Sequence, residues 1–315
     1  MQRVLDAIDA FWEYLASVEL RPLAIAIACH VLKLACTSRA WRNVLAAAYP
    51  QTNVRWRSIY AAYVSGVGVN AIFPARAGDV VRLYLAHRAI PDSTYTTVVT
   101  STVALTLVDF VLSSAVFGWA LTQGVLPGFD ALPTLPGFDF AWLFDNEIAS
   151  QILVVALAIS LVLLAIWVRE HAEDFMARVA QAFAVLHAPV RYLRSVVFWQ
   201  LCDWGLRLAT IWFLLGAFGI DQSPRNVLLV QATQSLATLV PVSPGGIGTE
   251  QAFLFYVFRG EVARKTLLAF SVGMKLTITA VNVAVGFTAL LLTVGTVRFR
   301  RVVDKAEAAQ GAGRL

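Results

Sequence analysis

The stretch NAIFPARAGDVVRLYLAHR, Asn70–Arg88, decides the fold of this protein, because it places a broken and charged turn directly after an apolar segment. Pro74 and Gly78 interrupt any helix here, and three arginines and an aspartate accompany them. The preceding segment, Ile59–Phe73, is short, since a helix needs about 20 residues to cross a hydrocarbon core of about 30 Å. The stretch therefore predicts a turn at membrane depth, if the rest of the chain is built for a membrane.

The composition of the chain indicates a membrane protein. Hydrophobic residues make up 58% of the 315 residues, charged residues only 14%, and the mean hydropathy is +0.68. Soluble domains carry about 25% charged residues. The sequence predicts an all-α polytopic membrane protein of the cytoplasmic (inner) membrane. The expected spans are Val98–Leu121, Ile152–Val168, Val196–Phe218, Thr266–Val294 and, more weakly, Leu20–Ala35.

The domain organisation follows from these spans. Apolar residues at helical spacing in the first nineteen positions predict an interfacial amphipathic helix. The expected division is residues 1–19 as this helix, 20–297 as the transmembrane domain and 298–315 as a cytoplasmic tail. Within the domain, residues 20–123 form a first repeat, 150–168 a linker span and 195–297 a second repeat.

The distribution of arginine predicts the topology. Basic residues cluster after the first span, after the linker span and after the last span, whereas residues 124–149 contain no lysine or arginine. The positive-inside rule places the basic clusters in the cytoplasm. A full crossing at Ile59–Phe73 would put its two arginine-rich flanks on opposite sides. We therefore expect a re-entrant hairpin, with residues 37–57 and 76–96 on the cytoplasmic side.

A second motif repeats the design about 170 residues later, in LATLVPVSPGGIGTEQAFLFYVFR, Leu236–Arg259. In both motifs a proline is followed by a glycine four residues on and then by an acid, here Pro244, Gly248 and Glu250. Chance similarity is the alternative, since the match is short. If the similarity between the two motifs reflects a true repeat, it predicts two inverted repeats, each with one re-entrant helical hairpin, as in alternating-access transporters.

Charged residues inside the spans are expensive and mark function or pairing. Asp203 and Arg207 are four residues apart, so a structural ion pair and a substrate role both remain open. Asp109 has no local partner, and we expect it and Glu250 to face the protein interior. His30 and Lys33 are interpreted as interface residues. The candidate cations for Asp109 are Arg76, Arg82 and Lys275, and direct binding of a cationic group is the alternative.

The glycine run after Pro244 allows backbone N–H groups to approach a ligand at a helix start, where phosphate is favoured. A tight turn that only needs flexible backbone is the alternative. The sequence contains no serine-hydrolase, zinc-protease, Walker or dinucleotide fingerprint and no metal-ligand spacing. We therefore expect no enzymatic activity, no cofactor and no metal.

These motifs resemble the transmembrane, flippase-like domain of the lysylphosphatidylglycerol synthase family over roughly residues 20–297. The first motif is similar to that family's Asn…Pro-x-Arg-x-Gly-Glu…Arg segment, LTLVDFVLS to its Asp-bearing span, and PVSPGGIGTEQAF to its glycine segment. The chain departs from the pattern at Asp79, where glutamate is usual, and at Lys275, where arginine is. The resemblance implies substrate-binding residues Asn70, Arg76, Asp79, Arg82, Asp109, Gly245, Gly246, Gly248, Glu250 and Lys275, with turns at Pro74, Gly78 and Pro244.

The resemblance implies a lipid translocase for a phospholipid or polyprenyl-phosphate lipid with an anionic or aminoacylated headgroup. Since only a short tail follows Arg301, we do not expect the family's synthase domain or its reaction in this chain. The alternatives are a membrane anchor or regulatory subunit for a separate glycosyltransferase or lipid synthase, and a small-solute transporter. A nucleic-acid partner is not expected, because the basic residues sit where topology already requires them.

Overall fold

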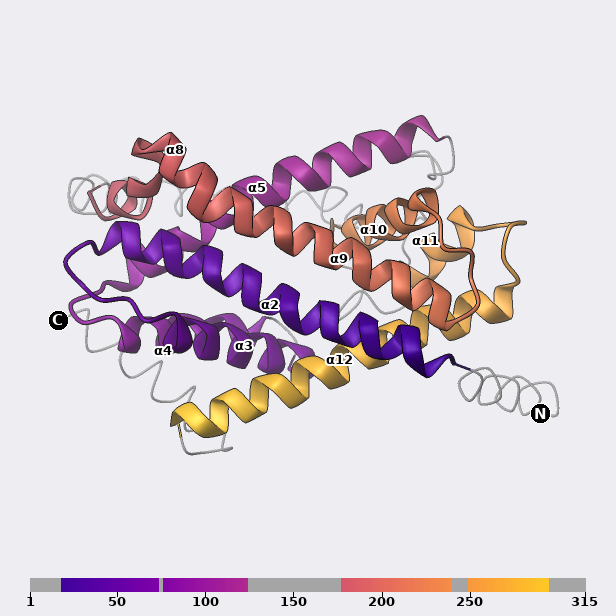
Figure 1. Ribbon diagram of the computed structural model, residues 1–315, viewed down its shortest axis with the longest axis horizontal. Helices are drawn as coiled ribbons and strands as arrows, with labels where there is room; N and C mark the ends of the chain where they lie inside the picture. The colour runs from indigo at the N-terminus through magenta and orange to yellow at the C-terminus, as the bar shows by residue number, and fades with distance from the viewer. Residues whose placement is uncertain (1–17, 74–75, 124–176, 240–248, 295–315) are drawn as a thin grey trace, which may run out of the picture.

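The computed structural model describes residues 18–73, 76–123, 177–239 and 249–294, and these form a bundle of helices that lie along one long axis (Figure 1). No strand occurs in these ranges. The expected interfacial helix, the linker span at 150–168 and the tail after residue 297 lie outside the described residues. The fold class is therefore all-α for the described part of the chain.

The first half contains two long helices with a pair of short helices between them. The first short helix ends at Ile72 and the second begins at Ala77, so two short helices replace one span, and Gly78, predicted as part of the turn, lies in the first turn of the second helix. The helices are α2 (Leu20–Ala48), α3 (Trp56–Ile72), α4 (Ala77–Ala89) and α5 (Tyr95–Thr122).

The second half repeats this order of long helix, short pair and long helix. It begins with short turns that lead into the first long helix, one of them a π-helical turn. The elements are η2 (Ala184–His187), α8 (Pro189–Tyr192), η3 (Leu193–Val197), α9 (Phe198–Ala217), α10 (Pro224–Leu239), α11 (Thr249–Val257) and α12 (Arg264–Val294).

Helices α2 and α9 run antiparallel and form the most extensive helix pair (Figure 1). At one end the backbone N–H of Glu19 donates to the carbonyl of Ala217 at 3.0 Å. At the other end the Asn43 amide donates to the carbonyl of Ser195 at 2.6 Å. Since α2 belongs to the first half and α9 to the second, this pair joins the halves.

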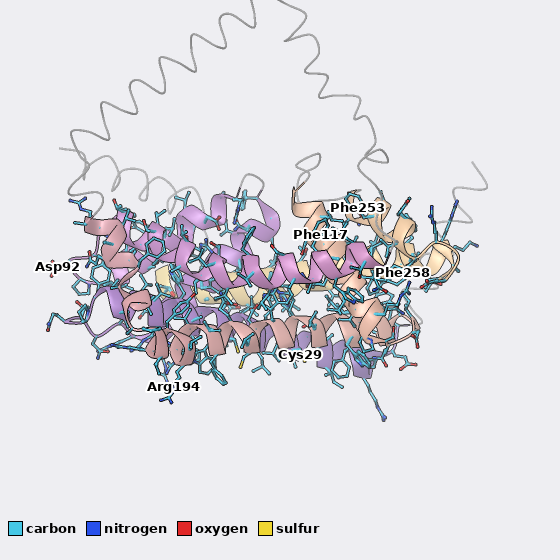
Figure 2. The ribbon with its side chains drawn as sticks, turned by 90° about the horizontal axis from the view of Figure 1, so that it is seen from above. Cys29, Asp92, Phe117, Arg194, Phe253 and Phe258 are labelled. Carbon is cyan, nitrogen blue, oxygen red and sulfur yellow. The ribbon has the colours of Figure 1, made fainter. Side chains whose placement is uncertain are left out.

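The two short pairs lie at opposite ends of the bundle. The loop after α4 returns to the loop after α2, where the N–H of Thr94 donates to the Tyr49 hydroxyl at 3.0 Å. In the second half, Arg225 at the start of α10 is 2.9 Å from Glu261 in the loop after α11. Each pair therefore starts and finishes at one end of the molecule. Asp92 marks the first end and Phe258 lies toward the second (Figure 2).

Glycines allow α3 to pack closely on its neighbours. A Cβ on Gly78 of α4 would lie 1.9 Å from the carbonyl oxygen of Gly66 in α3. A Cβ on Gly286 of α12 would lie 2.5 Å from the Cα of Gly68.

The apolar core is divided between a cluster around Trp41 and Leu45 in the first half and one around Phe270 in the second.

In the part of the chain that the structure describes, three helices are long and apolar enough to cross a membrane: Leu20–Ala48, Tyr95–Thr122 and Arg264–Thr293. The weak expectation at Leu20–Ala35 was therefore too cautious, because it is the first part of a 29-residue helix. The segment expected at Val196–Phe218 is helical but is not among the three, since polar residues interrupt it. Large apolar side chains on α5 face outward, with Phe110 exposed to 72%, as a lipid-facing surface requires.

Candidate functional site

The tip of the α3–α4 pair is a closed polar network. The Asn70 side chain accepts from the backbone N–H of Gly78 at 2.7 Å and donates to Asp79 at 3.0 Å. Asp79 also contacts Arg76 and Arg82, with N–O distances of 3.0 and 3.5 Å. The described part of the first motif therefore folds into one unit in which Asp79 bridges both arginines and one net positive charge remains.

Local backbone conformation explains this geometry. Arg76 precedes α4 with φ 57°, in the left-handed region that few side chains adopt. Asp79 lies in the first turn of α4, where a helix favours negative charge. The Arg76 side chain is 82% exposed, whereas that of Arg82 is 22% exposed and lies over the Trp41 ring at 5.8 Å. Arg76 is thus the accessible cation of the tip.

A second polar group lies between α5 and α9. One guanidinium nitrogen of Arg207, Nη2, is 3.1 Å from Asp109 Oδ1 and 3.1 Å from Asp203 Oδ2. Trp204 donates its indole N–H to Asp109 at 3.0 Å and places its ring 4.8 Å from the Arg207 guanidinium. We call Asp109, Asp203 and Arg207 the central triad.

The central triad corrects one expectation from sequence. Asp109 is paired with Arg207, and not with Arg76, Arg82 or Lys275. The i,i+4 pair of Asp203 and Arg207 does form, but it is not self-contained, because Arg207 also serves a carboxylate on another helix. Asp109 faces the protein only in part, since 42% of its side chain is exposed.

Residues from α2 and α3 surround the central triad. The Thr37 hydroxyl donates to Asp203, whose side chain is only 2% exposed. Lys33 lies within electrostatic range of all three members of the triad, which corrects its interpretation as an interface residue. Tyr63 of α3 faces both the triad and Arg82, so it connects the centre to the α3–α4 pair.

A third polar group occupies the second half. Glu250 on α11 has a side chain that is 8% exposed, as expected for an interior carboxylate. It contacts Lys275 of α12 at 3.8 Å and accepts from the Gln234 amide at 3.3 Å. The structure therefore brings these two predicted residues together. The predicted Pro74, Pro244, Gly245, Gly246 and Gly248 lie outside the described residues.

Lys33, Thr37, Asp203, Trp204 and Arg207 join the site without having been among the predicted site residues. The i,i+4 spacing of Asp203 and Arg207 was the available signal, but it does not reveal a partner from α5. Asp109 and Trp204 are 95 residues apart in sequence. Only the packing of α5 on α9 brings them together.

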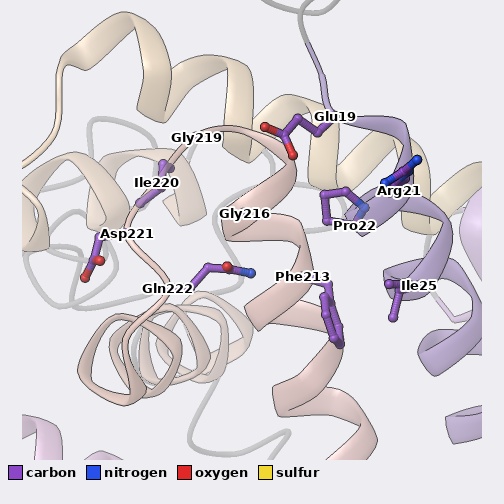
Figure 3. A pocket seen from close by; sticks show the side chains of 10 residues that line it. All are labelled: Glu19, Arg21, Pro22, Ile25, Phe213, Gly216, Gly219, Ile220, Asp221 and Gln222. Atoms are coloured by element: carbon purple, nitrogen blue, oxygen red, sulfur yellow. The ribbon is translucent and has the colours of Figure 1, made fainter.

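A cavity among the described residues does not coincide with these groups. It has a volume of about 520 Å³ and lies where α2 begins and α9 ends, with Glu19 and Arg21 on one side and Phe213 and Gln222 on the other (Figure 3). No residue of the three polar groups lines it. The candidate site therefore rests on the polar contacts inside the bundle.

Comparison with known families adds to this geometry. The family model described as lysylphosphatidylglycerol synthase TM region matches residues 5–286. The chain belongs to this family. It is accordingly a membrane protein, in agreement with its three long apolar helices. A comparison with curated proteins found no match.

Proposed function

We propose that this protein is a lipid translocase of the cytoplasmic membrane, which moves a phospholipid or polyprenyl-phosphate lipid with an anionic or aminoacylated headgroup between the leaflets. The observation that carries the proposal is the central triad. It joins a helix of the first half to one of the second, at the middle of the 28-residue helix α5. Charges at such depth are retained where they serve transport or pairing. The proposal requires no catalytic activity and no cofactor.

The helix arrangement supports a translocation path. In the proposed topology, α3–α4 and α10–α11 are re-entrant hairpins of two inverted repeats that enter the membrane from opposite sides. Their helices have 17, 13, 16 and 9 residues, fewer than the roughly 20 that a crossing needs. Each hairpin starts and finishes at one end of the bundle.

The polar groups receive roles in this scheme. Arg76, the exposed cation at the tip of α3–α4, meets the headgroup phosphate from the cytoplasmic side. The glycine segment Gly245–Gly248 receives it on the other side through backbone N–H groups. The carboxylates Asp79, Asp109 and Glu250 balance the cations between binding events. The partner is therefore the membrane lipid itself.

Translocation in liposomes tests the proposal. Purified protein is reconstituted into liposomes with fluorescent phosphatidylglycerol. A membrane-impermeant reductant then quenches the labelled lipid in the outer leaflet. We expect the wild type to move lipid faster than empty liposomes. Asp109→Asn should lower the rate at least about tenfold, a change of about 1.4 kcal/mol in the barrier, because the triad loses the carboxylate that links α5 to Arg207. Glu261→Gln, a carboxylate of the Arg225 surface pair, is the matched control and should equal the wild type.

The alternatives give different results in the same assay. Equal rates for wild type, Asp109→Asn and empty liposomes, with polyprenyl-phosphate lipids as well, would favour an anchor or regulatory subunit of a separate synthase or glycosyltransferase. Uptake of a soluble compound without lipid movement would favour a small-solute transporter.

A further inference from the structure

Arg207 has a hydrogen-bond donor that its two carboxylates do not use. Both carboxylates contact the same nitrogen, Nη2. The Nε donor of Arg207 is buried and has no hydrogen-bond partner in the described part of the chain. A guanidinium has donors in a planar fork that matches a phosphate bidentately. The side chain therefore has an unused donor beside the two contacts that hold it.

Formal charge in the cluster is balanced before any ligand binds. Asp109 and Asp203 are negative, and Arg207 and Lys33 are positive. The Lys33 ammonium forms no hydrogen bond or ion pair within the described ranges, although it lies near all three. A phosphodiester at Arg207 would add one uncompensated negative charge to a site inside the membrane. Uncompensated charge is costly there, so a compensating proton is favoured.

The titratable and charged groups that face the cluster come from five helices. Within the described residues they are His30, Lys33 and Cys36 of α2, Tyr63 of α3, Arg82 of α4, Asp109 of α5, and Cys202, Asp203 and Arg207 of α9.

The two carboxylates would be affected differently if Arg207 turned to a phosphate. Asp203 would keep its hydrogen bond from Thr37 and the nearby Lys33. Asp109 would keep the neutral N–H of Trp204 and an electrostatic interaction with Lys33 that is weaker than the one Asp203 has. The Asp109 side chain is also 42% exposed, whereas that of Asp203 is 2% exposed. Asp109 is therefore the carboxylate that both needs a proton and has access to one.

We propose that Arg207 binds the headgroup phosphodiester and that Asp109 takes up one proton in the same step, so that lipid binding is coupled to protons. An O–H bond forms on Asp109 with a proton from solvent, while Arg207 keeps its own protons and exchanges a carboxylate for the phosphate. When the lipid leaves, Asp109 releases the proton and the pair with Arg207 reforms. This inference rests on the proposed function and adds to it a headgroup-binding residue and a coupling ion.

Calorimetry of the purified full-length chain tests the coupling without any transport. Dihexanoyl-phosphatidylglycerol is titrated into the protein in detergent, in two buffers of different ionisation enthalpy, so that the number of protons taken up per bound lipid is obtained. We expect the wild type to take up close to one proton. The affinity for the lipid should fall about tenfold for each unit by which the pH is raised, over the pH range in which binding takes up the proton.

Three variants identify the residues. Asp109→Asn, which mimics the neutral acid, should bind the lipid without proton uptake and with an affinity that pH does not change. Arg207→Gln should lose binding, and Arg207→Lys, which keeps the charge without the planar fork, should weaken binding while keeping the uptake. Glu261→Gln should behave as the wild type. The charge-keeping variant is informative even if Arg207→Gln does not fold.

Glycerophosphoglycerol, the same phosphodiester without acyl chains, distinguishes a free headgroup from a lipid as the ligand, and proton uptake with either supports the coupling. Binding of the lipid by the wild type with no buffer dependence would overturn the coupling and leave the proposed translocase intact. Uptake that persists in Asp109→Asn would overturn the role of Asp109. If neither probe binds, the inference fails, and the liposome assay decides separately on translocation.

Discussion

Arg207 contacts two carboxylates that lie on different helices. Its neighbour Asp203 is almost fully buried, so the pair cannot rely on solvent to stabilise a leftover charge. Breaking a buried ion pair from one side is far more costly than removing both partners. The stability of the bundle should therefore depend on the triad as a unit.

Replacing one member and then two tests this dependence. We expect Arg207→Gln to lower the free energy of unfolding by about 3 kcal/mol, because Asp203 keeps a buried charge without its main counter-ion. Arg207→Gln combined with Asp203→Asn should recover most of that loss. Thermal unfolding in detergent measures both. A double variant no more stable than Arg207→Gln alone would show that buried charge is not the cause.

At the scale of the element, the α3–α4 pair depends on the absence of two side chains. Gly66 and Gly78 let the two helices approach until one backbone carbonyl occupies the place of a Cβ. The Asn70 hydrogen bond to the N–H of Gly78 requires that approach. Packing and the polar tip are therefore coupled.

Gly78→Ala should separate α3 from α4, because its Cβ would lie 1.9 Å from the Gly66 carbonyl oxygen. We expect a loss of about 2 kcal/mol in the free energy of unfolding, typical of overpacking. Gly118→Ala is the matched control, since nothing lies within 4 Å of a Cβ at that position in α5. Alanine at this position should leave the free energy of unfolding unchanged or raise it, because alanine has a higher helix propensity than glycine. Equal stability of the two variants in thermal unfolding would contradict the close packing.

At the scale of the whole molecule, the proposed topology places the loops around α3–α4 on one side of the membrane. Cysteines introduced at Asn53 and Pro91, after replacement of Cys29, Cys36 and Cys202, should react with an impermeant maleimide from the same, cytoplasmic side. A cysteine at Asp221 should react from the opposite side. Labelling of Asn53→Cys and Pro91→Cys from different sides would show that the pair crosses the membrane.

The sequence predicted the helical class and the break after Ile72, since both depend on local composition and on proline and glycine. It also predicted that Glu250 lies inside. It did not predict the partner of Asp109, because Arg207 is distant in sequence and several cations were equally available. Nor did it predict the full length of α2, whose polar residues His30 and Lys33 are accommodated by other helices. Local physics determines the elements, whereas long-range packing determines the charge pairs.

The pairing of α2 with α9 also has a consequence for biosynthesis. Thr37 and its partner Asp203 are 166 residues apart, and a ribosome needs about ten to thirty seconds to synthesise that length. During this interval α2 carries Lys33 and Thr37 without the helix that receives them. The pair of α2 and α9 can therefore form only after α9 has been synthesised.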